Sequence, residues 1–447
     1  MLKFLKWDLK LKVRSSFTII IIFLFLFISF VCIHLIEEKR TYRSFTTKYA
    51  TDSFVYLNQM KWSDQLQERD KIDFPKSEYT YKLYDDVRKN IWELSFSDDY
   101  KEVNRLQSFL SLLTLRTRFL ERGIEEVKKE EIISIWENVS NDVLYDNVDF
   151  YVREKGESDF PKNMFLLQAR YFETLYLNDL NMAYDDEVSN VSFLYFMYDK
   201  AIPLFIIVLG FLLVYPSINR SINNGQVKLL LTSGQHRRNI FIGKWISNVT
   251  YIWILTIPLS VIVAFLAALK GELVSLSYPM VILKDPFINF KGIPNYFDIA
   301  VDNGRYASLY PNSIGRTAPL GEYFMYGGDI SASLSIISFI EFMLLAVILL
   351  SLFITFLVAF IQLFSVVFKS EFVSLITSII FFGFFYGLSL SFVQGNHVNL
   401  SPFNLFNAIR VIEGVYNTTF IVSFVTLIIC TILLILIGNY LFSKKEI

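Results

Sequence analysis

Cysteine and histidine are nearly absent from this sequence, with two Cys and three His among 447 residues. Cys32 and Cys430 lie far apart in separate apolar runs, so no disulfide framework is indicated. The histidines, at positions 34, 236 and 397, are isolated from one another. No metal centre is therefore expected.

Charge is also scarce, because only 19% of the residues are charged, against about 25% in an average soluble protein. The segment 37–197 holds 53 of the 85 charged residues, and the rest of the chain consists mainly of long uncharged runs. The formal net charge of -1 provides no basic stripe of the kind that binds nucleic acid. This pattern excludes an ordinary soluble enzyme and predicts a polytopic α-helical membrane protein.

Six apolar runs approach or exceed the ~20 residues that a helix needs to cross the hydrocarbon core of a bilayer. The first is too long for the apolar part of a cleavable signal peptide, and no small-x-small cleavage site follows it. We interpret it as a membrane anchor. The predicted spans are residues 15–36, 201–219, 245–269, 330–368, 372–393 and 419–442.

Basic residues in short loops predict the orientation of the spans. The first 14 residues carry five basic residues and one acid, and the loop 217–244 carries five basic residues and no acid. Lys369, Lys444 and Lys445 fall on the same side if there are six spans. Both termini are therefore predicted to be cytoplasmic. The cytoplasmic parts are then an interfacial helix at 1–14, the loop 217–244 and the tail 443–447, and the exterior parts are 37–197, 270–329 and 394–418.

The exterior segment 37–197 is predicted to be a mainly helical domain, because apolar residues recur at helical spacing, as at Tyr84, Val87 and Ile91. Its excess of nine acidic charges suits a solvated surface, and binding of a cationic peptide is the alternative. The insertion 270–329 holds 7 of the 18 Gly and 5 of the 11 Pro, a composition typical of turns.

No catalytic constellation is visible. The pair Gly243-Lys244 invites comparison with a phosphate-binding loop, but in G-x-x-x-x-G-K-[ST] the first Gly falls on Arg238 and the last position on Trp245. The predicted cytoplasmic segments comprise about fifty residues, too few for a nucleotide-binding domain of ~100–200 residues. If the protein uses ATP, the ATPase is another chain.

The loop 217–244 is the most informative segment. Val227, Leu230 and Leu231 share one face of a short helix, and Gly225 and Gly234 punctuate its ends. This pattern predicts an amphipathic helix across the cytoplasmic mouth of the bundle. The alternative is an interfacial helix that only connects two spans.

With this topology, the pattern Gly-x-x-x-x-Leu-Leu, then Arg, then Gly-Lys at the start of the next span resembles the permease subunits of ABC-2-type transporters. A second match precedes the last span, where the resemblance implies short exterior re-entrant helices. The N-terminal residues also resemble the interfacial helix before span one of that family. The matching residues are Gly225, Leu230, Leu231, Arg238, Gly243 and Lys244 in the loop, and Pro402, Phe403, Asn404 and Gly414 before the last span.

The resemblance implies a permease that sits in membrane lipid, dimerises with an identical or different permease, and docks two cytoplasmic ATPase subunits. ATP and Mg²⁺ would bind to the ATPase, and no cofactor is expected on this chain. The loop helix, about 217–238, would be the coupling helix. Its apolar residues Val227, Leu230 and Leu231 are expected to anchor in a groove of the ATPase. Arg237 and Arg238 would meet acidic groups or lipid phosphates, or serve only as positive-inside anchors.

Glu341 is the one acid within the fourth apolar run. An acid at the centre of a span costs ~2.5–3.5 kcal/mol, so its default interpretation is functional. The alternative is a position in the headgroups or the exterior domain, because Glu341 lies near the outer end of an overlong run.

Abundant Ile, Phe, Lys and Asn suggest a bacterium of low genomic GC, and hence a location in the bacterial cell membrane. The expected function is export of a peptide or an amphipathic, lipid-like substrate, including antimicrobial peptide export or self-immunity. One alternative is a lantibiotic-resistance permease, a type that commonly has four or ten spans. Another is a non-transporting receptor or scaffold with a sensing exterior domain. A membrane-bound enzyme is disfavoured by the absence of any catalytic cluster in the exterior loops.

Overall fold

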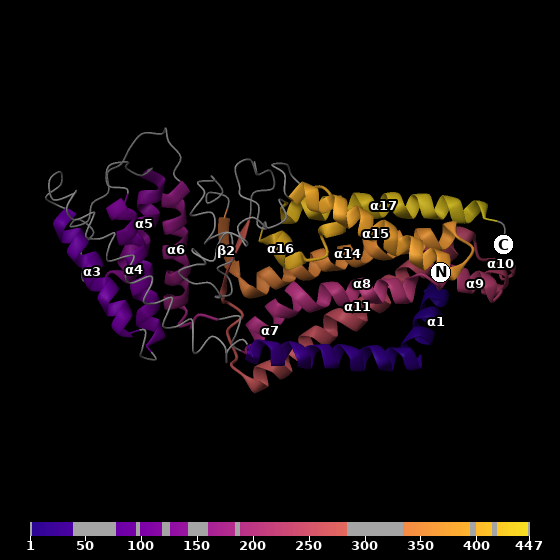
Figure 1. Cartoon of the computed structure of the whole chain (residues 1–447), viewed down its shortest axis with the longest axis horizontal. Coiled ribbons are helices and arrows are strands. Elements are labelled where there is room, and N and C mark those ends of the chain that lie inside the picture. The colour runs from indigo at the N-terminus through magenta and orange to yellow at the C-terminus, as the bar shows by residue number, and fades with distance from the viewer. Residues whose placement is uncertain are drawn as a thin grey trace.

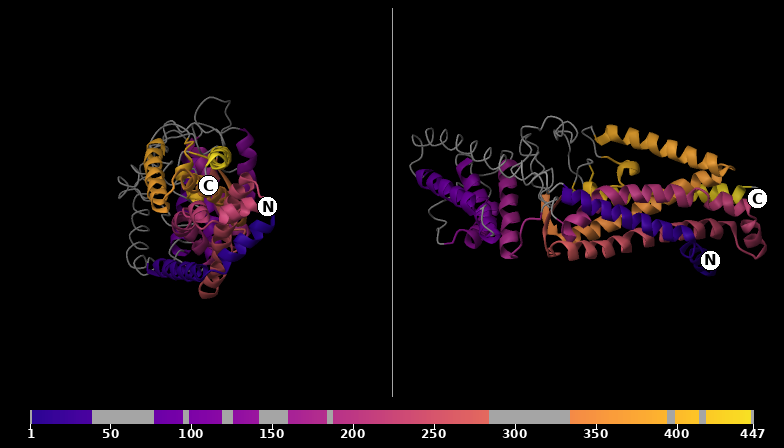
Figure 2. Two further views of the ribbon diagram at one scale, coloured as in Figure 1. Left: turned by 90° about the vertical axis from the view of Figure 1, so that its right-hand side faces the viewer. Right: turned by 60° about the horizontal axis from the view of Figure 1, so that its bottom comes forward.

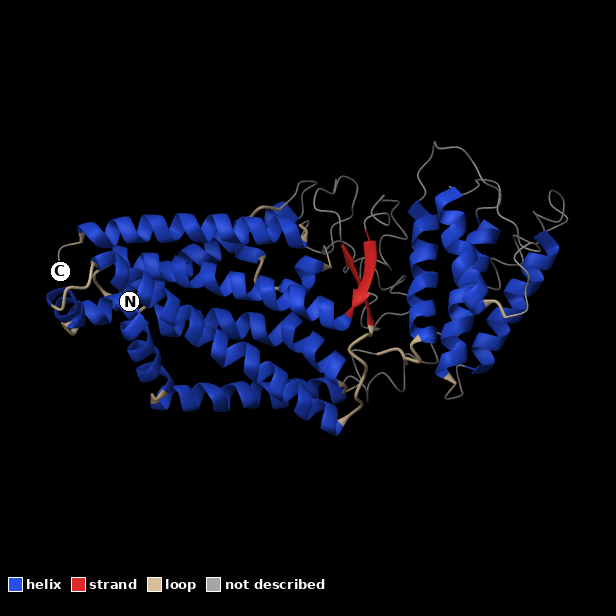
Figure 3. Ribbon diagram, turned by 180° about the vertical axis from the view of Figure 1, so that it is seen from behind, coloured by secondary structure: helices blue, strands red, loops and turns tan. Residues whose placement is uncertain are grey.

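The computed structural model describes residues 2–38, 77–94, 99–118, 126–141, 160–183, 188–283, 334–393, 399–413 and 418–445, and the structural statements below concern these residues. Long helices form a bundle at one end, and the shorter helices α3 to α6, between residues 77 and 177, form a second bundle at the other (Figure 1, Figure 2). Figure 3 shows a small sheet between the two bundles.

Six helices in the described part of the chain are long and apolar enough to cross a membrane. Their lengths suit the ~20 residues that the hydrocarbon core requires. The prediction of a polytopic α-helical membrane protein with six spans is confirmed. In chain order the spans are Ser16–Glu38, Asn190–Asn223, α11 (Arg237–Lys270), α14 (Phe339–Val367), Glu371–Ser389 within α15 (Glu371–Val393), and α17 (Phe420–Lys444).

Span 2 consists of four consecutive segments. It begins at a capping box, in which Ser189 accepts a hydrogen bond from the Ser192 backbone and the Ser192 side chain accepts one from the Ser189 backbone. The helix thus starts well before residue 201, where the apolar run alone places it. The segments are α7 (Asn190–Phe196), the π-helical η2 (Met197–Ala201), α8 (Ile202–Val214) and α9 (Ser217–Asn223).

Span 4, α14, is the central helix of the bundle, and it contacts α8, α11, α15 and α17. It starts at Phe339 rather than near residue 330, because Leu334–Ser338 forms a strand and Ser338 caps the helix. The packing is close at Gly210 of α8, where an added Cβ would lie 2.6 Å from Leu357 Cδ2. Glycine here lets α8 approach the central helix.

Spans 1, 5 and 6 turn large apolar side chains outward, for example Phe23, Phe384 and Leu433. A continuous exposed surface of this kind is unfavourable in water. In a bilayer it contacts lipid, and the backbone polar groups are satisfied within each helix. The arrangement therefore fits a membrane environment.

The second bundle contains α3 (Ser77–Leu94), α4 (Tyr100–Arg118), α5 (Glu126–Val139) and α6 (Phe160–Leu177). It has its own apolar core, separate from that of the spans, around Leu112, Leu113 and Trp136. These helices fall within the segment 37–197, in which the sequence predicts a mainly helical domain.

A two-stranded antiparallel sheet of β1 (Pro279–Leu283) and β2 (Leu334–Ser338) lies between the bundles. It contacts α6 on one side and α14 on the other. The hydroxyl groups of Tyr171 on α6 and Tyr278 beside β1 are 2.8 Å apart. The four-helix bundle is thus tied to the start of the central span. Most of the insertion 270–329 falls outside the described residues.

Candidate functional site

The basic segments recognised in the sequence meet at one end of the span bundle, opposite the α3–α6 bundle (Figure 1). Arg220 of α9 forms an ion pair with Glu371 at the start of α15, at 3.5 Å. Arg237 at the start of α11 donates to the carbonyl oxygen of Lys445, which follows α17. These contacts join the ends of spans 2, 3, 5 and 6. We call this end the basic end.

The short helix α10 (Gln226–Thr232) connects spans 2 and 3 at the basic end, and glycine shapes the turn on each side of it. Gly225 has a φ of 72° and Gly234 a φ of 84°. Glycine adopts this left-handed region at little cost, whereas other residues are strained there. The two glycines recognised in the sequence therefore set where α10 begins and ends.

One side of α10 packs into the chain itself. Val227 is 0% exposed and belongs to an apolar cluster with residues from α9, α11, α14 and α17, and Leu230 and Leu231 pack against the same cluster. The three side chains proposed as anchors in an ATPase groove are therefore turned toward the chain's own core. The opposite side of α10 is open and carries Lys228 and Leu229, with Leu229 71% exposed.

The other residues of the loop motif differ in their surroundings. Arg237 also donates to the carbonyl oxygen of Ser443, at 3.1 Å, so it anchors the start of α11 to the end of α17. Arg238 is exposed beside it, and Gly243 is buried within α11.

Lys244 is buried in an ion cluster that joins the N-terminal helix α1 (Leu2–Val13) to α11. Its Nζ lies 2.6 Å from Asp8 Oδ1. The other carboxylate oxygen of Asp8 lies 2.8 Å from Lys12 Nζ and accepts a hydrogen bond from Ser247 at 2.6 Å. Lys12 also donates to Asn248 Oδ1 at 2.7 Å. Lys244 thus holds α1 beside the start of the third span.

Asp8 is a buried, paired acid that sequence reasoning missed, since it stood out only as the lone acid among five basic residues. Burial raises the pKa of Asp8, but Lys12 and Lys244 outweigh it and lower the pKa to about 2. Burial lowers the pKa of Lys12 to about 8, against the opposing effect of Asp8. At neutral pH Asp8 is therefore ionised between two lysines.

The segment before span 6 contains two short helices, η5 (Pro402–Asn404) and α16 (Ala408–Ile412). Phe403 lies against four phenylalanine rings of α14 and α15, with centroid distances of 5.0 to 5.6 Å. Asn404 is fully buried, and its side-chain amide finds no hydrogen-bond partner among the described residues. Gly414 lies outside the described residues.

A buried polar network beside α16 also escaped sequence reasoning. Arg410 Nε and Nη2 donate to the two carboxylate oxygens of Asp199 in η2, at 2.7 and 2.9 Å. Tyr195 of α7 donates to Glu413 Oε1 at 2.5 Å. More than 200 positions separate the partners in sequence, so no local pattern identifies the network.

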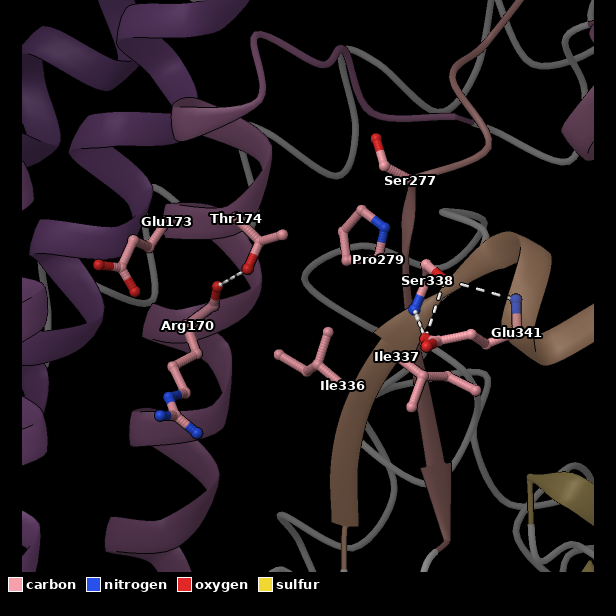
Figure 4. A pocket seen from close by; sticks show the side chains of 9 residues that line it. All are labelled: Arg170, Glu173, Thr174, Ser277, Pro279, Ile336, Ile337, Ser338 and Glu341. Carbon is pink, nitrogen blue, oxygen red and sulfur yellow. Dashed lines mark hydrogen bonds between the residues drawn. The ribbon is translucent and has the colours of Figure 1, made fainter.

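Glu341 lies in the first turn of α14, where its Oε2 accepts hydrogen bonds from the Ser338 backbone and hydroxyl, both at 2.9 Å. The side chain is exposed and lines a cavity of about 440 Å³ between α6 and the sheet (Figure 4). Thr174 and Ile336 lie on the opposing walls. Helix capping accounts for the contacts of Glu341, and an intramembrane polar role stays a prediction.

Within the described ranges, no three His, Cys, Asp or Glu side chains are grouped so that they could hold a metal ion. The most distinctive features are instead contacts between helix ends. The fold and the basic end define a multi-pass helical membrane protein with a short loop helix held between two spans.

The family model for ABC-2 family transporter proteins matches residues 4–447, nearly the whole chain. The chain belongs to this family and is a transmembrane transport component. Membership implies association with an ABC ATPase. A search of curated proteins and one of solved structures gave no match.

Proposed function

We propose that this chain is the permease subunit of an ATP-driven exporter that moves a peptide or an amphipathic, lipid-like substrate out of the cell or the membrane. Two cytoplasmic ATPase subunits bind ATP and Mg²⁺, and a second permease, identical or different, completes the transporter. The family match over residues 4–447 carries this proposal. The location is the bacterial cell membrane, with the basic end in the cytoplasm.

The open side of α10 is the proposed docking surface for the ATPase. Leu229 projects an apolar side chain into solvent, and Lys228 lies exposed next to it. An aliphatic side chain that fills a pocket of the partner, surrounded by a polar rim, is one way to anchor an interface. Arg238, exposed at the start of α11, adds a positive charge for acidic groups on the partner.

The buried side of α10 explains how force would reach the spans. Val227 packs with Ile218 of α9, Phe241 of α11, Val366 of α14 and Phe442 of α17. A packed cluster of this kind transmits displacement rather than absorbing it. A partner that pushes on Leu229 therefore acts on the ends of four helices at once, and through Lys244 and Asp8 on α1 as well.

Among the candidate substrates, a positively charged one is favoured by the acidic segment 37–197, which holds 31 acidic and 22 basic residues. Its four-helix bundle reaches the central span through the contact of Tyr171 with Tyr278. Antimicrobial peptides, which are commonly cationic and amphipathic, match both the charge and the membrane setting. Export, or removal of such a peptide from the membrane, is therefore the proposed direction.

The test is purification of the tagged chain in mild detergent from its native host, with identification of co-purifying proteins by mass spectrometry. A stoichiometric subunit with a phosphate-loop lysine is the expected result. Its absence from an otherwise intact complex would favour a receptor or scaffold instead.

Leu229→Asp tests the docking surface separately from the family assignment. The variant should keep its thermal stability, because Leu229 is exposed, but lose the ATPase in the same purification. Leu273→Asp is the matched control, since Leu273 is 77% exposed beyond the opposite end of α11. Asp at 230 or 231 is a poorer test, because both leucines support the chain's own core. Retention of the ATPase by Leu229→Asp would exclude this side of α10 as the docking surface.

A further inference from the structure

The buried network of Tyr195, Asp199, Arg410 and Glu413 lies at the end of the spans opposite the basic end. Figure 1 shows α7 and α16 at the end that faces the α3–α6 bundle. Asp199 and Lys200 belong to η2, the π-helical interruption of span 2. Such interruptions are rare and frequently mark functional positions in helices. The network is the polar contact between span 2 and the short helix α16.

The charges in this network are unequal. Both carboxylate oxygens of Asp199 are bound to Arg410, and Asp199 also accepts a hydrogen bond from Asn407 Nδ2 at 2.9 Å. Lys200 Nζ lies 2.9 Å from Asp199, but its side chain is 58% exposed. Arg410 and Asp199 thus balance each other inside the protein. Glu413 is the surplus buried acid, and it is only 1% exposed.

The carboxyl group of Glu413 is incompletely satisfied. Oε1 accepts the hydrogen bond from Tyr195, whereas Oε2 accepts none from the described residues and lies 3.5 Å from Arg410 Nη1. An ionised oxygen without a donor is costly when buried, and a neutral carboxyl group reduces this cost. Burial raises the pKa of Glu413 to about 7, against the opposing effects of Arg410 and of the Tyr195 hydrogen bond.

The charged and titratable groups that face Glu413 come from α7, η2 and α16. Tyr195 comes from α7, Asp199 and Lys200 from η2, and Arg410 from α16 itself. The helices α14 and α17 also contact α16. Glu341 of α14 is exposed and bound to Ser338. On α17, Cys430 lies in the middle of the helix, and Tyr440 and Lys444 lie in its last two turns, at the basic end.

We propose that this network is a proton-dependent latch: with Glu413 protonated it holds α16 against span 2, and loss of that proton releases α16 at the outer end of the bundle. Release leaves Glu413 ionised in a more solvated position. The carboxyl pKa falls from about 7 in the latched state toward its ordinary value of 4.5 in the released state. The latch is therefore strongest below about pH 4.5, weakens as the pH rises from there to about 7, and is weakest above that. It operates whatever the substrate is.

Hydrogen–deuterium exchange of the full-length protein in lipid nanodiscs tests the latch. Protection of residues 408–412 is measured at pH 5.5 and pH 7.5, with labelling times scaled for the intrinsic exchange rates. The two pKa values predict about a 20-fold loss of protection at the higher pH. An unchanged protection in the wild-type protein would overturn the proposal.

Two variants assign the effect to Glu413. Glu413→Gln mimics the neutral acid, so α16 should stay protected at both pH values. Tyr195→Phe removes the hydrogen bond that lowers the pKa of Glu413, so the midpoint of release should move to higher pH. Glu341→Gln is the matched control and should retain the wild-type response. A wild-type response in Glu413→Gln, or an unmoved midpoint in Tyr195→Phe, would contradict the latch.

Discussion

Two buried ion clusters join a short helix to a span, one at each end of the bundle, and they differ in the sign of their surplus charge. At the basic end one acid, Asp8, lies between Lys12 and Lys244, and both of its oxygens are occupied. At the end next to the α3–α6 bundle Asp199 already balances Arg410, and Glu413 keeps one oxygen without a hydrogen bond from the described residues. Asp8 in the first cluster stays ionised at neutral pH, whereas Glu413 in the second cluster titrates there. The comparison indicates that α1 is attached permanently to its span, whereas the attachment of α16 is releasable.

Removal of the acid at the basic end should have the largest effect. Asp8→Asn leaves Lys12 and Lys244 together without a carboxylate, and breaking a buried ion pair typically costs about 3–5 kcal/mol. The apparent free energy of unfolding in mild detergent should fall by this amount, and α1 should lose protection from hydrogen exchange. Lys6→Gln, an exposed change on the same helix, is the control. Wild-type stability in Asp8→Asn would show that the cluster does not hold α1.

The stability of the α1 attachment should also depend on pH, and in the opposite direction to that of the latch. The pKa of Asp8 is lowered to about 2 in the folded protein, from an ordinary value of 3.8. Its contribution to stability is thus present above pH 4 and is lost as the pH falls toward 2. Between pH 5.5 and 7.5, protection of α1 should stay constant while that of α16 changes. A parallel change in both helices would contradict the comparison.

Arg410→Gln should have the next largest effect. It leaves Asp199 buried without its bidentate partner, at a cost of about 2–4 kcal/mol, because Lys200 remains nearby to moderate the loss. In this variant α16 should be unprotected at both pH 5.5 and pH 7.5. Persistent protection of α16 would show that its apolar contacts, rather than the ion pair, hold it in place.

The contrast between the two ends also shows what the sequence reveals. The spans were predictable because lipid demands long uncharged runs, but the true starts of span 2 and α14 are set by Ser189 and Ser338. Hydropathy does not register such caps. The position of α10 was predictable from Gly225, and its apolar side from the spacing of Val227, Leu230 and Leu231. The surface that this side contacts was not predictable, because only tertiary packing shows that it faces the chain's own core rather than a partner.

The ion clusters mark the limit of local patterns. Asp8 and Lys244 are 236 positions apart, and Arg410 and Asp199 are 211 apart. Each residue taken alone looks like a charge at the edge of a span, where charges are common. Only the fold shows that these charges are buried and paired.

The smallest expected effect comes from removing the surplus charge at the basic end. Lys12→Met keeps most of the side-chain length and leaves Asp8 with Lys244 and Ser247, so a balanced pair remains. The variant loses the hydrogen bonds to Ser247 and Asn248 and the ion pair of Lys12 with Asp8, and should cost about 1.5–3 kcal/mol in the same unfolding measurement. A loss as large as that of Asp8→Asn would mean that both lysines are essential. The attachment of α1 would then depend on a surplus charge, as that of α16 does. The distinction between a permanent and a releasable attachment would fail.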